Sequence, residues 1–479
     1  MPYPVSALKI DTFWEKNMCD KVKTLDLSRE ELKKRAERMR KEKWASLEVA
    51  IPEKYRESVI GELKKIYSLF DYEASARWLA GLYDPETGGF YSAMSARAHE
   101  GFGPDIEATY LVLSAVGTMG MAELFDGDWA KANPSDVMQK AGEWIRSLQD
   151  ERDGFFYNPQ WPKEYVEKVG FLLRVTRDHG TAKTMLSRTG LKPKYEMHTG
   201  NKDGAPKGNS SMLAQYESDE AFREYIKGLE EELSGVDDKE RAWKFYLWGS
   251  YFQSSIGLMS EGMKDMLVEF VDKYQNPENG VWNEKIDHNA TNAIHKICSV
   301  YTRIGREMRY ADKMIETTLK VLSFDAKTHP AGNICELYNI WSCLLYIYEN
   351  IRVAGHGTKE EKEERITEMK NLVFSQVAEP IRATYEQMLN YYIGDGSFST
   401  YVGRSHPGTC HCYTAVPGTK EGDIAGFLHA TSAMPHYILA GLELLDFEIP
   451  FFTEYERLIY IDELRAAKPA VKKPNPNPR

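Results

Sequence analysis

The sequence has no long hydrophobic run and few cysteines. No stretch approaches the roughly 18 consecutive apolar residues of a transmembrane helix, so we expect no membrane partner. Six cysteines among 479 residues are too few for a disulfide framework. Residues 1–21, MPYPVSALKIDTFWEKNMCDK, have no basic start followed by an apolar run. We therefore expect no secretory signal and a cytoplasmic location.

The sequence also lacks the common cofactor and nucleophile signatures. We find no Walker loop, no HExxH, no GxSxG and no Rossmann fingerprint. The net charge is −11 and the pI is near 5.6, which disfavours nucleic acid as a partner because nucleic acid needs a basic stripe. A small molecule or an oligosaccharide is the expected substrate, with no cofactor.

Helical periodicity dominates what is present, and alternating strand patterns are scarce. Ser28 and Glu31 predict a capping box that opens a charged helix. We expect a helical extension over 1–53, a main domain over 54–447 with an exposed loop or lid at 190–211, and a C-terminal segment, 448–479, whose Pro- and Lys-rich tail is disordered. Further helices are predicted at 54–70, 136–149, 238–260, 308–323, 333–353, 359–375, 377–392 and 424–446.

One short pattern occurs four times along the chain. A helix end is followed by Asp or Asn, then Gly, then an aromatic residue. Glycine supplies the positive φ of such a turn, and the aromatic ring can pack back on the helix. A polar cluster then precedes or opens the next helix, so the unit is outer helix, turn, polar entry and inner helix. The four copies are WLAGLYDPETGGFY (78–91), WIRSLQDERDGFFY (144–157), FVDKYQNPENGVW (270–282) and MLNYYIGDGSF (388–398).

These turns, followed by helices such as DIEATYLVLSAVG, resemble the repeats of the terpenoid-cyclase and protein-prenyltransferase toroids over roughly residues 60–445. Many polysaccharide lyases and glycoside hydrolases share that architecture. The resemblance implies an all-α fold, an (α/α)6 toroid of inner and outer helices. In such a toroid, the inner helices begin on one face, so the four polar clusters would converge in one funnel. In chain order the clusters are Asp105/Glu107, Arg174/Arg177/Asp178/His179, Asp287/His288/Asn289, and Glu421/Asp423 with His429.

Sugar cleavage accounts for more of these clusters than other chemistry. Glycoside hydrolysis needs two carboxylates, and a lyase acting on a uronic acid needs groups that neutralise the carboxylate, remove a proton and protonate the leaving oxygen. We therefore predict a glycoside hydrolase or polysaccharide lyase. The predicted catalytic residues are Asp105, Glu107, His288, Asn289, Asp423 and His429. The predicted substrate-binding residues are Arg174, Arg177, Asp178, His179, Trp282, Trp161, Tyr110 and Glu421.

Two other kinds of function stay open. An isoprenoid-handling enzyme is one, but the DxDD and DDxxD motifs of cyclases are missing, since Asp237-Asp238 stands alone in SGVDDK. A prenyltransferase would need zinc, for which Cys410, Cys412, Asp423 and His429 are the candidate ligands. The third possibility is a toroid that binds a partner at the funnel without catalysis. Three other cysteines in apolar helical text, Cys298, Cys335 and Cys343, are predicted to be buried thiols.

Overall fold

The computed structural model describes residues 27–169, 174–197, 214–409 and 412–476. Within these ranges the chain is predominantly helical, which confirms the all-α prediction. The one sheet in the described part pairs two short antiparallel strands, β1 (Gly408–Thr409) and β2 (Cys412–Tyr413). Among the described helices, none is long and apolar enough to cross a membrane.

The helices begin and end close to where the sequence predicts. Helix α2, the first in the described residues, starts with the expected capping box of Ser28 and Glu31. The predicted helix at 424–446 is divided into α18, a π-helical turn at His429–Ala433, and α19. The helices are α2 (Arg29–Ala50), α3 (Glu53–Tyr67), α4 (Tyr72–Gly81), α5 (Met94–Ala98), α6 (Ile106–Thr118), α7 (Ser135–Ser147), α8 (Lys163–Val169), α9 (Thr176–Thr189), α10 (Asp219–Glu232), α11 (Asp238–Ser255), α12 (Glu261–Tyr274), α13 (His288–Ile304), α14 (Ala311–Leu322), α15 (Ile334–Ala354), α16 (Lys359–Gln376), α17 (Ala378–Met388), α18 (Ile424–Leu428), α19 (Met434–Gly441) and α20 (Glu454–Ala466).

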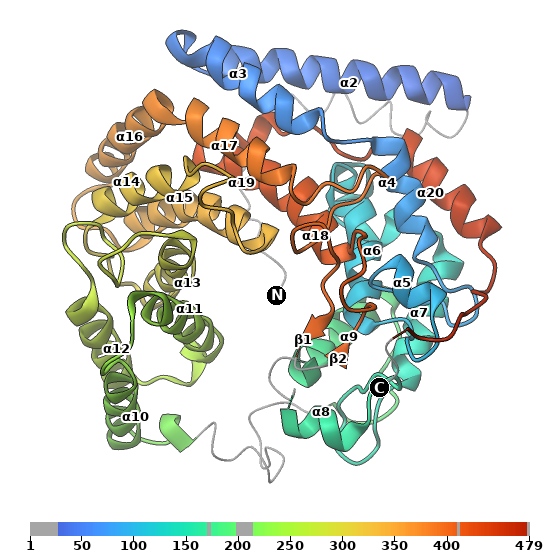
Figure 1. Ribbon diagram of the computed structural model, residues 1–479, viewed down its shortest axis with the longest axis horizontal. Coiled ribbons are helices and arrows are strands. Elements are labelled where there is room, and N and C mark those ends of the chain that lie inside the picture. The colour runs from blue at the N-terminus through green and yellow to red at the C-terminus, as the bar shows by residue number, and fades with distance from the viewer. Residues whose placement is uncertain (1–26, 170–173, 198–213, 410–411, 477–479) are drawn as a thin grey trace.

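The helices curve in two rows around a central space (Figure 1). Successive inner helices pack side by side in the order α11, α13, α15 and α19, and then α18, α6 and α9. Outside them lie α10, α12, α14, α16 and α17 on one side and α4, α20 and α7 on the other (Figure 1). The apolar core fills the layer between the rows, with Trp341, Tyr348 and Tyr391 fully buried.

The four predicted glycine-aromatic turns all form. Gly88, Gly154, Gly280 and Gly396 have φ between 72° and 87°, the region that glycine enters without steric cost. At Gly280 a Cβ atom would lie 2.8 Å from the backbone nitrogen of Met314, so a side chain is excluded there as well. The aromatic residues that follow are buried, which makes each turn a fixed joint between an outer and an inner helix. These rings are Phe90, Phe156, Trp282 and Phe398.

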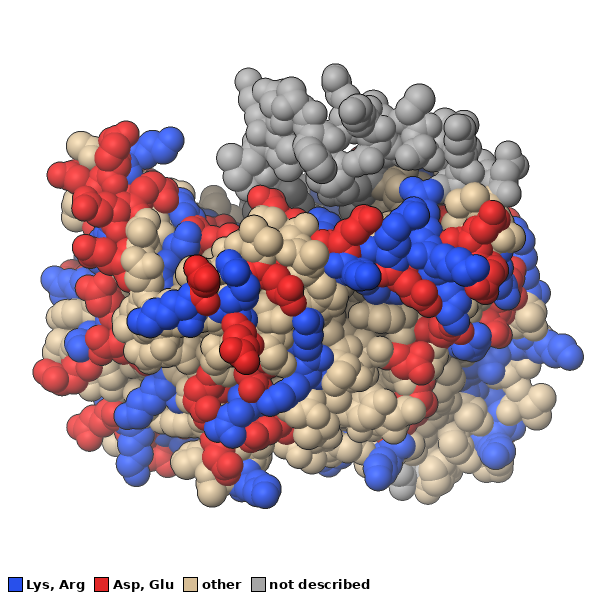
Figure 2. Space-filling view, turned by 90° about the horizontal axis from the view of Figure 1, so that it is seen from above, with Lys and Arg blue, Asp and Glu red and all other residues tan. Residues whose placement is uncertain are grey.

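Helix α2 is held on the body of the protein rather than standing apart. Arg40 donates hydrogen bonds to the carbonyls of Pro450 and Phe451 and pairs with the buried Glu456 at 3.0 Å. Its guanidinium also lies 3.7 Å from the ring centroid of Tyr72. Figure 2 looks on the side of the molecule where α2 and α3 lie, and there acidic and basic side chains are interspersed.

The C-terminal tail departs from its prediction. Its composition predicts disorder, but part of residues 468–473 lies along the segment before α6. The Lys473 nitrogen donates to the Ala98 carbonyl and the Glu100 nitrogen donates to the Lys473 carbonyl, each at 2.8 Å. Arg97 donates to the Lys468 carbonyl at 2.7 Å. Hydrogen bonds therefore hold residues 468–473 in place, where composition alone predicts no structure.

Candidate functional site

The polar entries of the inner helices are first of all helix caps. Asp105, Asp287, Asn333 and Asp423 each accept a hydrogen bond from a backbone nitrogen in the first turn of α6, α13, α15 and α18, respectively. Such caps satisfy donors that the helix leaves unpaired. Capping explains why an acid or amide recurs at this place in the sequence pattern. The residues that could act on a substrate are therefore the side chains around the caps.

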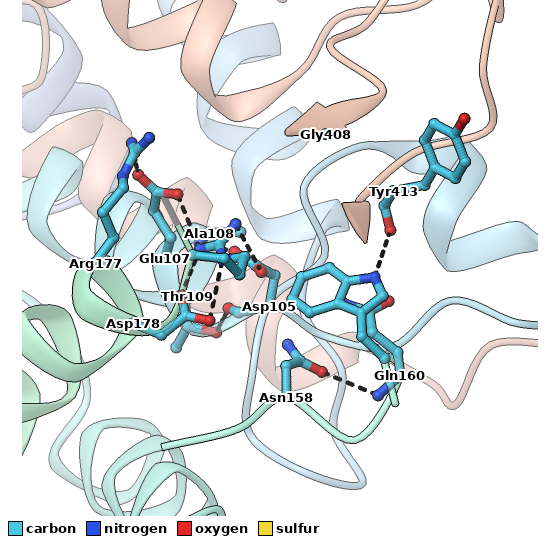
Figure 3. A network of polar contacts seen from close by, with 12 residues as sticks. Asp105, Glu107, Ala108, Thr109, Asn158, Gln160, Arg177, Asp178, Gly408 and Tyr413 are labelled. Atoms are coloured by element: carbon cyan, nitrogen blue, oxygen red, sulfur yellow. Dashed lines mark hydrogen bonds and ion pairs between the residues drawn. The ribbon is translucent and has the colours of Figure 1, made fainter. Parts of the chain in front are cut away.

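Two of the predicted clusters meet at the N-terminus of α6, in a buried ionic cluster around Arg174. Arg174 donates hydrogen bonds to Asp178 and, at 3.0 Å, to Glu107, and it lies 3.7 Å from Asp105. Arg177 pairs with the other oxygen of Glu107. Figure 3 shows Glu107 and Arg177 facing each other, with Asp178 and Asp105 next to them. The cluster thus holds three carboxylates and two guanidinium groups.

The pKa values of the three carboxyl groups in this ionic cluster are shifted in opposite directions. Burial is the largest influence on each, and it raises the pKa of Asp178 to about 7 although Arg174 acts to lower it. Burial also raises the pKa of Asp105, whose Oδ2 atom is buried without a hydrogen-bond partner among the described residues. For Glu107, Arg177 and Arg174 outweigh burial and lower the pKa. Asp178 is therefore the carboxyl of the cluster whose charge changes near neutral pH.

The carboxylate of Asp423 holds the segment 400–406 in place through hydrogen bonds. Its carboxylate is completely buried and accepts hydrogen bonds from the nitrogen and hydroxyl of Thr400, the nitrogen of His406 and the nitrogen of Gly426, all within 3.0 Å. Glu421 is similarly held by Ser95 and Ser405. Asp423 is predicted as a catalytic residue, but this arrangement leaves its oxygens no free position for a substrate.

His406 and His429 lie beside the ionic cluster and form one wall of the candidate site with Glu107 and Arg177. The charges of Glu107 and Arg177 act on the pKa of both histidines, and His406 acts on His429. Burial is the main cause that lowers the pKa of His429 to about 4, so its imidazole is neutral at neutral pH. His429 begins the π-helical turn, a distortion often found at functional sites.

A second wall comes from α11, α13 and α15. Tyr338 of α15 lies 4.7 Å from His429, centroid to centroid, and its hydroxyl receives a hydrogen bond from the Cys335 thiol at 3.4 Å. Asn339 bonds both Cys335 and the hydroxyl of Tyr246 on α11. A continuous row of side chains therefore runs from His429 to Tyr246. Cys335, predicted to be a buried thiol, is partly exposed within this row.

Lys296 of α13 completes the second wall. Its pKa is lowered, first by burial and also by the charge of Arg177. The same Arg177 charge acts on Tyr246, and the Lys296 ammonium lies 5.9 Å from the centroid of the Tyr246 ring. Arg177 is therefore the residue whose field reaches both walls. Its side chain is 51% exposed, so the guanidinium group is accessible from solvent.

The third predicted cluster stays within its own repeat. Asp287 caps α13, and His288 packs its ring at 5.8 Å from Phe324. Burial lowers the pKa of His288 to about 4. Asn289 lies two turns before Lys296 on the same face of α13. The contribution of α13 to the site is Lys296, deeper in the helix than the entry residues that the sequence pattern emphasises.

Most of the aromatic residues predicted to bind substrate belong to the scaffold. Trp282 is 1% exposed and donates to the Val271 carbonyl, so no sugar can stack on it. Trp161 is also buried and donates to the Tyr413 carbonyl at 3.3 Å. Tyr110 packs edge-on against Trp129, and His179 against Phe155 and Phe156.

An exposed ring that the prediction omits lies next to the site. Trp243 of α11 is 51% exposed, and its ring lies 5.6 Å from that of Tyr246, centroid to centroid. The spacing of three residues within one helix places both rings on the same face. The sequence signal for Trp243 is its spacing of three residues from Tyr246 within one predicted helix.

The candidate zinc ligands that the structure describes do not come together in one cluster. Cys410 lies outside the described residues, and Cys412 is buried in a small apolar cluster with Phe155 and Trp161. Asp423 is occupied by the four hydrogen bonds described above. In the described part of the chain, no group of three or more His, Cys, Asp or Glu side chains is arranged to hold a metal ion.

Comparisons with protein-family models, with curated proteins and with solved structures found no match.

Proposed function

We propose that the protein is a carbohydrate-active enzyme that cleaves an oligosaccharide or glycoside between the two walls described above, on an (α/α)6 toroid. The observation that carries this proposal is the row of side chains from His429 through Tyr338, Cys335 and Asn339 to Tyr246. Burial shifts the pKa of His429, Cys335 and Tyr246 in this row. Such rows of groups with shifted pKa values are typical of catalytic sites.

His429 and Tyr246 are suited to opposite steps of proton transfer. The lowered pKa of His429 keeps its imidazole neutral, so it can accept a proton from the substrate. Burial raises the pKa of Tyr246 above its usual range, so its hydroxyl keeps its proton and can give it to the leaving oxygen. In this proposal His429 is the base and Tyr246 is the acid.

Hydrolysis by a pair of free carboxylates is less well supported. Glu107 and Asp178 are held by arginines, and Asp423 by backbone and hydroxyl donors. A glycosidase needs one carboxylate free to attack the sugar or to activate water and another free to give up a proton. Acid and base chemistry by histidine and tyrosine uses the groups that remain accessible.

The experiment is to incubate the purified protein with a panel of neutral and acidic oligosaccharides and to analyse the products by chromatography. Replacing His429 by Gln and Tyr246 by Phe should each lower kcat about a hundredfold or more, since general acid or base catalysis contributes about that much. Tyr392→Phe, on an exposed ring outside the two walls, serves as the control. Cleavage that survives unchanged in both site variants would refute these roles.

A further inference from the structure

Lys296 is a partly buried amine without an acidic partner. Its neighbours along α13 are buried, and within the described ranges no carboxylate lies within 4 Å of its nitrogen. Lys244 and Lys264 are also partly buried, but each has a glutamate within 3.0 Å. Withdrawing an ammonium group from water without a counter-charge is costly, so such a site favours the uncharged amine. A lysine in this state is suited to act as a nucleophile.

The stem of Lys296 is held between two helices, which fixes where the amine lies. A Cβ atom at Gly249 of α11 would lie 2.7 Å from the Cβ of Lys296, so the two helices pass close together there. The nitrogen of Lys296 lies 5.9 Å from the centroid of the Tyr246 ring. Trp243 continues this aromatic surface at 5.6 Å from Tyr246 and is 51% exposed. The amine therefore lies beside an aromatic surface that solvent reaches.

The charges around Lys296 agree with its burial. Burial is the main cause that lowers the pKa of Lys296. Cys335 acts to raise this pKa, and Arg177 acts to lower it. The lowered pKa increases the fraction of uncharged amine at neutral pH, and the uncharged form is the one that attacks a carbonyl carbon.

Asn292 supplies an unused hydrogen-bond acceptor on the same side of α13. It stands four residues before Lys296, so the two side chains are neighbours on the helix surface. Asn292 is 4% exposed, and its Oδ1 atom is buried without a hydrogen-bond partner in the part of the chain that the structure describes. Buried acceptors normally have a partner. An acceptor beside an unpaired amine fits a ligand whose hydroxyl group is next to the carbon that the amine attacks.

We propose that Lys296 is a reactive amine that forms a Schiff base with a small α-hydroxy aldehyde or ketone, and that Asn292 accepts a hydrogen bond from the hydroxyl group of that ligand. The uncharged nitrogen attacks the carbonyl carbon, and a proton passes from the nitrogen to the carbonyl oxygen. The resulting hydroxyl leaves as water with the second amine proton, and a C=N double bond forms. No oxidant or reductant is consumed. This role does not require that the protein cleaves a glycoside.

Reductive trapping of the full-length protein tests this role. Glycolaldehyde and sodium cyanoborohydride, which converts an imine into a stable secondary amine, are added near neutral pH. Peptide mass spectrometry then follows the modification of each lysine. We expect Lys296 to be modified several times faster than Lys244 and Lys264, and its rate to reach half of its maximum at a lower pH. Modification of Lys296 no faster than that of the two paired lysines would overturn the proposal.

A second aldehyde tests the hydroxyl contact. Propanal has a methyl group where glycolaldehyde has its hydroxyl, and the ratio of the two rates at Lys264 corrects for their intrinsic reactivity. At Lys296 this ratio should be about threefold to tenfold higher, the gain expected from one hydrogen bond. Equal ratios at the two lysines would overturn the role of Asn292 and the choice of an α-hydroxy carbonyl compound.

Two variants locate the hydroxyl contact. Asn292→Leu should lower the ratio at Lys296 to that at Lys264, because leucine offers no acceptor. Asn371→Leu, at an exposed position of the outer helix α16, is the matched control and should leave the ratio unchanged. A ratio that stays high in Asn292→Leu would overturn the assignment of Asn292. Circular dichroism checks that both variants fold, and the comparison of lysines in the wild type does not depend on either.

Discussion

Arg174 donates two hydrogen bonds to Asp178, yet the carboxyl of Asp178 has a pKa near 7. Burial raises the pKa of Asp178 more than Arg174 lowers it, because Arg174 also pairs with Glu107 and lies beside Asp105. The N-terminal end of α9 is therefore held by the ion pair of Arg174 and Asp178, in which the charge of Asp178 changes in the physiological pH range.

This relationship predicts how stability depends on pH. The folded protein keeps a proton on Asp178 that the unfolded chain, with a pKa near 3.8, releases between about pH 4 and 7. The free energy of unfolding should therefore fall as pH rises through this window, by up to about 1.4 kcal/mol per pH unit. Urea titrations at several pH values measure it.

The substitution Asp178→Asn removes this titration and should flatten the fall in stability with pH. Glu224→Gln changes a carboxylate whose side chain is 74% exposed and should leave the pH dependence as it is. A slope that is the same in wild type and Asp178→Asn would show that Asp178 is not the group responsible.

Asp423 and Asp105 should respond differently to replacement by asparagine. Every oxygen of Asp423 accepts from two donors, and an amide nitrogen in place of one oxygen would face an N–H group. Asp423→Asn should therefore lower the free energy of unfolding by about 1–3 kcal/mol and reduce activity by displacing His406.

In Asp105 only one oxygen accepts a hydrogen bond, from Ala108. Asp105→Asn should cost less stability, because it keeps that acceptor and removes a buried charge. Thermal unfolding of the two variants side by side measures the difference. Equal loss of stability in both would contradict the anchoring role assigned to Asp423.

Two tryptophans near α11 should separate scaffold from site. Trp282→Ala leaves a cavity beside Phe245, whose ring stacks on it at 5.5 Å, and should cost about 3–5 kcal/mol. Trp243→Ala removes a half-exposed ring and should change stability by no more than about 0.5 kcal/mol. If sugars stack on Trp243, KM for oligosaccharides should rise while kcat holds. A rise in KM of the same size for a monosaccharide analogue would argue against an extended subsite there.

Truncation after Ala467 tests the role of the C-terminal tail. Without residues 468–479, the nitrogen of Glu100 and the carbonyl of Ala98 lose their partner Lys473. We expect faster hydrogen exchange at residues 98–103, just before the ionic cluster, and little change in the outer helix α14. Unchanged exchange at 98–103 would mean that this segment holds its conformation by other contacts.

Local signals in the sequence predict the helices and turns of the fold well. The capping box at Ser28, the helix bounds and the four glycine-aromatic turns follow from short-range rules, because φ at Gly280 and the cap at Asp287 depend on neighbours in the chain. The same rules mislead at the site. Asp423 and Trp282 have the residue types of a catalytic acid and a sugar platform, but long-range packing buries both.

The residues that the prediction omits share one property. Tyr246, Lys296 and His406 meet the predicted residues Glu107 and Arg177 only after segments more than 60 positions apart come together. Lys296 stands in the middle of an apolar helix, where the absence of a nearby acid cannot be recognised from sequence. Tertiary structure is needed to show that a charge has no partner.

The π-helical turn at His429–Ala433 has a consequence for the register of the helix that contains it. Pro435 has no N–H to donate to the preceding turn, and the wider turn accommodates this. An extra residue in a helix rotates everything after it by about 100°. His429 and the core residue Tyr437 thus face nearly the same way along one helix, and both rings lie against Tyr338, at 4.7 Å and 5.8 Å between centroids. If the same residues formed a regular α-helix, the two side chains would point about 80° apart, so that either the histidine would leave the site or the tyrosine would leave the core.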